Sequence, residues 1–239
     1  MGQWRMYRAL LGGAGLVGCI ALLAGQARAD VTETYNKWDV LVRANVRAAS
    51  PNLFGTVALP VKAERYYDGW ERARRDASRL PAMLALVAPA RSMARDDQIA
   101  FVQSAVHKRI RWMSDATEWG RHDYWASAAE TLQHGAGDME DRAILKMQAL
   151  RALGVPQRDF YLTMGRDKVG GPITVLIVRS GNRLLVLDDL GGAPVPADRR
   201  EGFEPMLTLA YGASWIHGRR IAQPGGTVTA AAASSTTAR

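Results

Sequence analysis

Cysteine is almost absent from this sequence. The only cysteine among the 239 residues is Cys19, which lies inside an apolar N-terminal stretch. A chain from which that stretch has been removed can form no disulfide, has no thiolate nucleophile and offers no cysteine ligand to zinc. Chemistry that depends on cysteine is therefore excluded for any form of the protein that begins after residue 29.

Long apolar runs and basic tracts are lacking as well. The apolar stretch from Leu10 to Ala24 is short and rich in glycine, so we expect no stable membrane span once it is removed. The net charge is +8, but the arginines are scattered, without a long basic tract or an aromatic-interleaved nucleic-acid motif. This pattern is typical of a solvated surface, and we expect no nucleic-acid partner.

The first 29 residues have the organisation of a secretory signal. Arg5 and Arg8 precede the apolar stretch, and Ala27-Arg28-Ala29 forms a small-residue cleavage site. We expect cleavage before Asp30 and a periplasmic protein. Leu16-Val17-Gly18-Cys19 also resembles a lipobox, so the alternative is a lipoprotein anchored through Cys19 or an uncleaved anchor.

The stretch from Gly135 to Leu153 organises the rest of the chain. Its apolar residues Met139, Ala143, Met147 and Leu150 recur at helical spacing, which predicts one apolar face. Asp138 is placed to cap the helix and Gly154 to end it. Backbone N–H groups converge at Met139 together with the positive end of the helix dipole, an environment that stabilises an anion.

The remaining pattern predicts an α+β protein, with the central helix packed on an antiparallel sheet. Helical spacing occurs in residues 65–78, 96–113 and 126–133, and strand-like segments follow at 159–164, 172–179 and 183–188. Residues 204–217 are expected to return to the sheet. We therefore expect one domain over residues 30–220, followed by a disordered tail over residues 221–239 that is rich in small and polar residues.

Three aromatic residues precede the central helix. Trp119, Tyr124 and Trp125 flank the loop that leads to it. Packing around the helix is the ordinary explanation, and the functional alternative is a peptide groove lined by these rings.

Several segments together resemble one protein family. The sequence GDMED at residues 137–141, the helix that follows it, DYWASAAETLQHGAGD at 123–138, LFGTVALPV at 53–61, ITVLIV at 173–178 and LVLDDL at 185–190 occur in the order of its motifs. The chain resembles the bacterial transglutaminase-like cysteine peptidases of the LapG type, periplasmic enzymes that cleave large surface adhesins. The resemblance implies a papain-like, transglutaminase-like core.

The resemblance also assigns the catalytic positions. The family's nucleophilic cysteine falls on Met139, its general-base histidine on Ile173 and its orienting aspartate on Asp188. A thioether has no proton to lose and isoleucine has no basic atom, so the family's reaction lacks two of its groups. Asp188 can alternatively satisfy backbone donors at the end of a strand.

A metal is implied at the acidic residues beside Met139. The family's calcium-associated positions fall on Asp138 and Glu140. Calcium takes six to eight oxygen ligands, so these carboxylates would need further oxygens, and helix capping is the competing explanation.

The sequence thus predicts a catalytically inactive homologue that acts in the periplasm as a binding or regulatory protein. Its expected partner is an adhesin-like protein, an active peptidase or an inner-membrane receptor. One alternative is a hydrolase with a different nucleophile, for which Ser127, Thr131 and Thr174 are the hydroxyls close in sequence. The other alternative is a structural or lipid-anchored envelope protein.

Overall fold

The computed structural model describes residues 53–63, 66–169, 171–221 and 229–231. All of them belong to one of the two compact units of the chain, Ala44–Arg239. The expected signal segment, Cys19 and most of the expected tail lie outside the described residues, so those predictions stay predictions. Within the described ranges, no helix combines the length and the apolarity that crossing a bilayer requires.

Helices dominate the first half of the described chain and strands the second half. The α-helices are α2 (Tyr67–Arg74), α3 (Pro81–Val87), α4 (Arg95–Arg109), α5 (Asp115–Glu118), α6 (Ala128–His134) and α7 (Met139–Ala152). Short 3-10 helices are η2 (Ala88–Ala90), η3 (Gln157–Asp159) and η4 (Ala197–Arg199). The strands are β1 (Val57–Val61), β2 (Arg111–Trp112), β3 (Ala136–Gly137), β4 (Phe160–Asp167), β5 (Gly171–Ser180), β6 (Arg183–Leu187), β7 (Val195–Pro196), β8 (Phe203–Ala210), β9 (Ala213–Ile221) and β10 (Thr229–Ala231).

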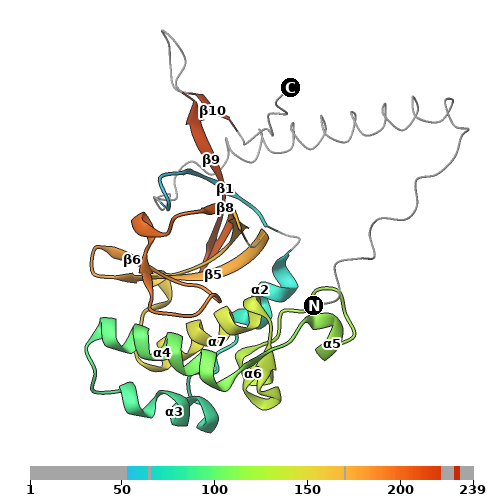
Figure 1. Ribbon diagram of the computed structural model, residues 1–239, viewed down its shortest axis with the longest axis vertical. Helices are drawn as coiled ribbons and strands as arrows, with labels where there is room; N and C mark the ends of the chain where they lie inside the picture. Colours follow the sequence, from blue (N-terminus) through green and yellow to red (C-terminus); the bar gives the residue numbers. More distant parts are fainter. Residues whose placement is uncertain (1–52, 64–65, 170, 222–228, 232–239) are drawn as a thin grey trace, which may run out of the picture. The chain divides into compact units, whose positions relative to one another are not determined.

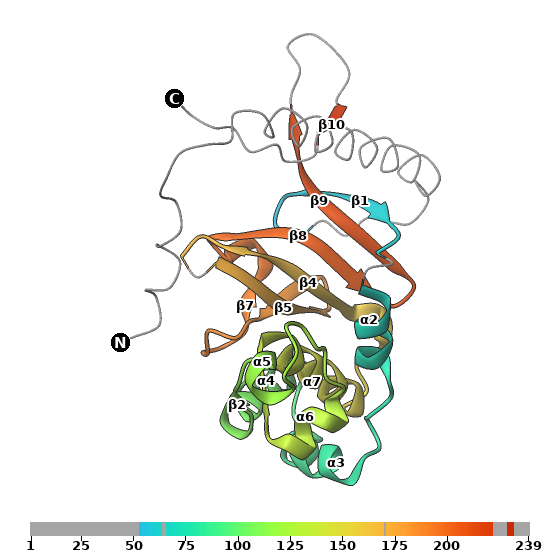
Figure 2. The same cartoon turned by 90° about the vertical axis from the view of Figure 1, so that its right-hand side faces the viewer.

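The larger sheet is antiparallel throughout. Its strand order is β1-β9-β8-β4-β5-β6-β7, and β10 also pairs with β9. Figures 1 and 2 show α4, α6 and α7 gathered on one side of this sheet. The predicted α+β class, with a central helix on an antiparallel sheet, is confirmed. Strand β10 lies within residues 221–239, the tail expected to be disordered.

Alternating side chains of the strands supply two separate cores. On β5, Leu176 and Val178 join the helices in one hydrophobic cluster. Ile173, Val175 and Ile177 join a second cluster on the opposite face, where they meet Leu53 and Phe203. The period-two alternation of a strand therefore builds both faces of the sheet from one continuous apolar sequence.

The ends of α6 and α7 are set by local sequence. Ser127 and Glu130 form a reciprocal capping box at the start of α6, and Gly135 ends that helix in the left-handed conformation. Asp138 caps α7 by accepting hydrogen bonds from the N–H groups of Glu140 and Asp141. Gly154 follows α7 with φ of 83°. The predicted cap and stop of the central helix are both confirmed.

The face formed by Met139, Ala143, Met147 and Leu150 is only part of the buried surface of α7. Every residue from Asp141 to Leu150 is buried, including four polar ones. Their partners are distant in sequence: Lys146 donates to the Asp188 carbonyl oxygen at 2.8 Å, and Gln148 donates to the Ala73 carbonyl oxygen at 2.8 Å. A helix enclosed on all sides can bury such side chains because each finds a hydrogen-bond partner.

Candidate functional site

The N-terminal end of α7 is reached through a short and tightly packed approach. Strand β3 pairs in parallel with β2, with Trp112 opposite Gly137. A Cβ atom added at Gly137 would lie 2.8 Å from the Asp141 Cβ, a distance that real Cβ atoms do not adopt. Glycine at this position therefore lets the chain turn into Asp138 directly above the first turn of α7.

Met139 and Ile173 are neighbours in space, although 34 positions separate them in sequence. The Met139 Sδ accepts a hydrogen bond from the Thr174 N–H at 3.3 Å. Met139 also packs against the hydrophobic cluster that contains Ile173, which is 8% exposed. The structure therefore brings together the two positions that the resemblance assigned to nucleophile and base. Neither side chain can take up or release a proton.

Asp188 is held by contacts of its own. Its carboxylate accepts hydrogen bonds from the Leu190 N–H at 3.2 Å and from the Arg200 Nε at 3.0 Å. Arg200 also donates to the Asp167 carboxylate at 2.7 Å, so one guanidinium joins the ends of β4 and β6. The bond from the Leu190 N–H agrees with the second explanation given for Asp188, in which its carboxylate satisfies a backbone donor at the end of a strand.

Three aspartates converge beside Met139. Carboxylate oxygens of Asp115, Asp138 and Asp141 all lie within 4.8 Å of one another. One oxygen of Asp115 accepts from the Tyr124 N–H at 2.6 Å, and one of Asp141 accepts from the Ala126 N–H at 2.7 Å. The second oxygen of each is buried and has no hydrogen-bond partner. Asp115 and Asp141 thus each keep one buried carboxylate oxygen that no hydrogen bond satisfies.

Burial dominates the electrostatics of these acids. It raises the pKa of Asp115 to about 6. Burial and the neighbouring Glu140 raise the pKa of Asp138 to about 7, while burial and Asp138 raise the pKa of Asp141 to about 8. Carboxylates that repel one another in a desolvated site favour either a bound proton or a bound cation.

The residues present fit a hard cation. Calcium is bound by carboxylate and carbonyl oxygens, and the cluster supplies three carboxylates of which two have an unused oxygen. Glu118 lies outside this cluster, and one of its carboxylate oxygens is 3.4 Å from the His134 Nδ1. Of the two metal residues expected from the sequence, Asp138 belongs to the cluster. Glu140 instead accepts from the Thr174 hydroxyl at 3.0 Å, and burial raises its pKa.

The aromatic loop does not present its three rings together. Trp125 is 5% exposed and belongs to the main hydrophobic core. Tyr124 is half-buried and donates to Glu130 at 3.0 Å, and Trp119 stacks on Tyr124 and on His134. Core packing accounts for most of the Trp125 ring, while one edge lines a small pocket of about 160 Å³ together with Tyr66, Asp68, Gly69, Arg72 and Asp123. The three rings therefore do not form one groove.

The hydroxyls considered as replacement nucleophiles are engaged elsewhere. Ser127 donates to Glu130 in the capping box, Thr131 donates to the Ser127 carbonyl oxygen, and Thr174 donates to Glu140. None of these three contacts involves an imidazole. Among the residues that the structure describes, these three hydroxyls are therefore not paired with a histidine base.

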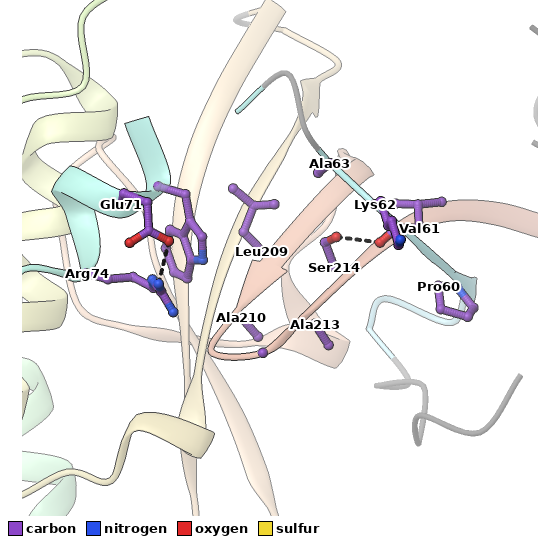
Figure 3. A pocket seen from close by; sticks show the side chains of 12 residues that line it. Pro60, Val61, Lys62, Ala63, Glu71, Arg74, Leu209, Ala210, Ala213 and Ser214 are labelled. Atoms are coloured by element: carbon purple, nitrogen blue, oxygen red, sulfur yellow. Dashed lines mark hydrogen bonds and ion pairs between the residues drawn. The ribbon is translucent and has the colours of Figure 1, made fainter. Parts of the chain in front are cut away.

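A cavity of about 420 Å³ lies elsewhere, between β1, α2 and the turn that joins β8 to β9 (Figure 3). The Ser214 hydroxyl on its wall donates to the Val61 carbonyl oxygen at 2.7 Å, and Arg74 pairs with Glu71. None of the residues expected to form the site lines this cavity. It is therefore separate from the site at the start of α7.

Two residues of interest were missed in the sequence. Asp115 stands 23 positions before Asp138, and only the pairing of β2 with β3 brings the two segments together. Trp112 is 55% exposed on β2. An isolated aspartate and an isolated tryptophan carry no local pattern, so nothing near them in the sequence marks either one.

Comparisons with known proteins found one matching family and several structures with a similar fold. The family described as bacterial transglutaminase-like cysteine proteinase BTLCP matches residues 81–195. The structure of Legionella pneumophila LapG is similar with a TM-score of 0.50 at 24% identity, covering 62% of this chain and 80% of that one. Calcium-bound Legionella pneumophila LapG gives the same TM-score and identity, with coverages of 63% and 86%.

No curated protein matches the sequence. The likeness to the solved structures shows a shared fold, while the family match includes Asp138, Met139, Ile173 and Asp188. Residues 81–195, which are 115 of the 239 residues of this chain, are similar to the bacterial transglutaminase-like cysteine proteinase family.

Proposed function

We propose that this protein is a catalytically inactive member of this family that acts in the periplasm as a binding or regulatory protein. The observation that carries the proposal is the contact between Met139 and β5 at the start of α7. A thioether that accepts the Thr174 N–H, beside the buried Ile173, fills the place where nucleophile and base would meet. Apolar side chains at both positions suit a closed, dry contact better than a reactive one.

Loss of both groups removes most of the catalytic power that such a site can have. Nucleophile and base act as a unit, and removing either one in a comparable hydrolase costs on the order of 10⁶-fold in turnover. What remains is a surface around α7 that can hold a polypeptide, because binding and bond cleavage use largely different contacts. The proposed partner is an adhesin-like protein, an active peptidase or an inner-membrane receptor.

Cleavage assays test the loss of activity. We expect wild-type protein to leave intact an adhesin segment that an active family member cuts under the same conditions. Cleavage that iodoacetamide stops would show a working thiol and overturn the proposal. Cleavage that persists with iodoacetamide would instead favour a hydrolase that uses a different nucleophile.

Calcium binding at Asp115, Asp138 and Asp141 is the second part of the proposal. It is supported by the unsatisfied oxygens of Asp115 and Asp141 and by the short separations between the three carboxylates. A ligand that binds only the folded state raises its stability by RT ln(1 + [L]/Kd), which is about 2.7 kcal/mol at 100 times Kd. We therefore expect calcium to raise the urea midpoint of the protein and a chelator to reverse the increase.

Matched amide variants separate the two candidate ligand sets. Asp141→Asn and Asp138→Asn are expected to abolish the calcium-dependent stabilisation, whereas Glu140→Gln should retain most of it. A loss of the stabilisation in Glu140→Gln as well as in Asp138→Asn, with Asp141→Asn unaffected, would instead favour the pair Asp138 and Glu140 that the resemblance indicated. A midpoint that the chelator leaves unchanged in wild type would leave helix capping as the whole role of Asp138.

A further inference from the structure

Trp112 combines wide exposure with a rigid position. Among the large apolar side chains that are exposed in the described ranges, it is the only aromatic one, at 55% exposure. Its strand β2 is fixed to β3 by hydrogen bonds from the Arg111 N–H to the Gly135 carbonyl at 3.0 Å and from the Met113 N–H to the Gly137 carbonyl at 3.2 Å. Backbone pairing therefore fixes the position of the Trp112 Cα, while much of the side chain faces solvent.

Three cations surround Trp112 in the sequence. Lys108, Arg109 and Arg111 are exposed, and their side chains form no ion pair or hydrogen bond with any residue that the structure describes. The sequence contains no acidic residue between Asp97 and Asp115. By contrast, Arg142 close by is paired with Asp189 at 2.7 Å. We call Lys108, Arg109, Arg111 and Trp112 the Trp112 surface.

Local structure explains only part of this composition. Lys108 and Arg109 lie in the last turn of α4, where cations are favoured by the helix dipole. That effect does not extend to Arg111, and it gives no reason for an exposed tryptophan. An exposed indole beside unpaired cations is instead the composition of an interface anchor, because tryptophan and arginine dominate binding energies.

The Trp112 surface adjoins the start of α7. Trp112 pairs with Gly137, the residue before Asp138 and two before Met139. A polypeptide that lies on this surface would therefore pass beside the position where the family's chemistry takes place. Three cations are few for a nucleic-acid site, which usually neutralises a longer run of phosphates.

We propose that the Trp112 surface binds an acidic polypeptide segment that lays a bulky apolar side chain on the Trp112 ring. The inference rests on the proposed binding function and specifies the contact surface and the chemistry of the partner. Carboxylates of the segment would pair with Lys108, Arg109 and Arg111, which gives orientation and a faster association rate. The apolar side chain would supply most of the affinity by covering the indole.

A display library of random twelve-residue peptides tests this directly, with the folded protein from residue 30 as bait. Peptides enriched by wild type should carry an excess of Asp and Glu and at least one large apolar residue. Their affinity should fall about tenfold or more in Trp112→Ala. Lys108→Glu with Arg109→Glu should weaken the same peptides about tenfold and shift new selections toward basic sequences.

Leu80→Ala provides the matched control, because Leu80 is exposed to 36% and lies before α3, outside the Trp112 surface. It should leave the affinity of every selected peptide unchanged. Selected peptides without an acidic bias, or with equal affinity for Trp112→Ala and wild type, would overturn the assigned surface while leaving a binding function in place. Failure to enrich any peptide would count against the binding function itself. Tighter binding of a single-stranded oligonucleotide than of any selected peptide would overturn the polypeptide assignment.

Discussion

Trp125→Ala is expected to lower the free energy of unfolding by about 3 to 5 kcal/mol, the range for removing a large aromatic side chain from a core. Trp125 is 5% exposed, and its ring lies 5.9 Å from the Tyr66 ring. A Cβ atom added at Gly69 would come within 2.9 Å of the indole, so the glycine leaves room for the ring. Urea unfolding with an unchanged m-value measures the loss.

Trp112→Ala is the matched comparison, because the same side chain is removed from a position 55% exposed. It should change the free energy of unfolding by no more than about 0.5 kcal/mol. Equal losses in the two variants would mean that Trp125 contributes no more to the core than a surface residue. If Trp125→Ala lowers the free energy of unfolding only slightly but impairs partner binding, Trp125 lines a peptide groove, which was the functional alternative considered for this residue.

The contrast between these two tryptophans shows where sequence reasoning stops. Neither tryptophan takes part in a helical or alternating pattern that would show whether it is buried. Trp125 is buried because α2 packs over it through Gly69, 56 positions earlier. Trp112 is exposed because its two-residue strand has a single partner, β3. Exposure of isolated residues thus depends on pairings between segments, which local sequence does not contain.

Elements with strong local signals were predictable. Asp138 and Gly154 mark the ends of α7, and β5 and β6 correspond to the strand-like segments expected at residues 172–179 and 183–188. The spacing of Ile99, Val102 and Val106 gives α4 its buried face. Each of these features depends on residues within a few positions of one another, where capping, turn formation and periodicity operate.

The site was predictable only in part for the same reason. Asp138 could be identified from its neighbours and from the resemblance, but the carboxylate that completes the cluster comes from Asp115. Lys146 could not be recognised as buried, because its partner is the Asp188 carbonyl oxygen, 42 positions later. A cluster whose residues come from separate segments can be recognised only once the fold is known, because the spacing of these residues in the sequence shows no pattern.

His217 gives the second large effect, a stability that depends on pH. Its ring lies between hydroxyl groups on the face of the sheet opposite α7. The Thr56 hydroxyl donates to the Leu53 carbonyl at 2.7 Å, so Thr56 accepts from the His217 Nδ1–H at 2.8 Å. The Nε2 atom then accepts from Thr208 at 2.7 Å, and Thr208 lies 2.9 Å from the Thr163 hydroxyl. This network fixes a neutral imidazole with its proton on Nδ1.

Burial lowers the pKa of His217 to about 4. The unfolded chain takes up the proton near pH 6.5, whereas the folded protein resists it. Stability is therefore fully present above about pH 6.5 and is lost as the pH falls toward about 4. A lowering of this size corresponds to a loss on the order of 3 kcal/mol. The hydrogen-bond partners of the ring are neutral, so no carboxylate compensates the charge.

His217→Gln isolates this contribution from the other titrating groups, such as His107, whose pKa is also lowered by burial. We expect wild type to exceed the variant in stability at pH 7, and the difference to shrink by most of 3 kcal/mol at pH 4.5, measured by urea unfolding at both values. The Leu53–Thr56 turn and strand β1 should lose amide protection first on acidification, because the imidazole links them to β8. Unfolding free energies of wild type and variant that remain parallel between pH 7 and pH 4.5 would show that His217 is not the acid-sensitive group.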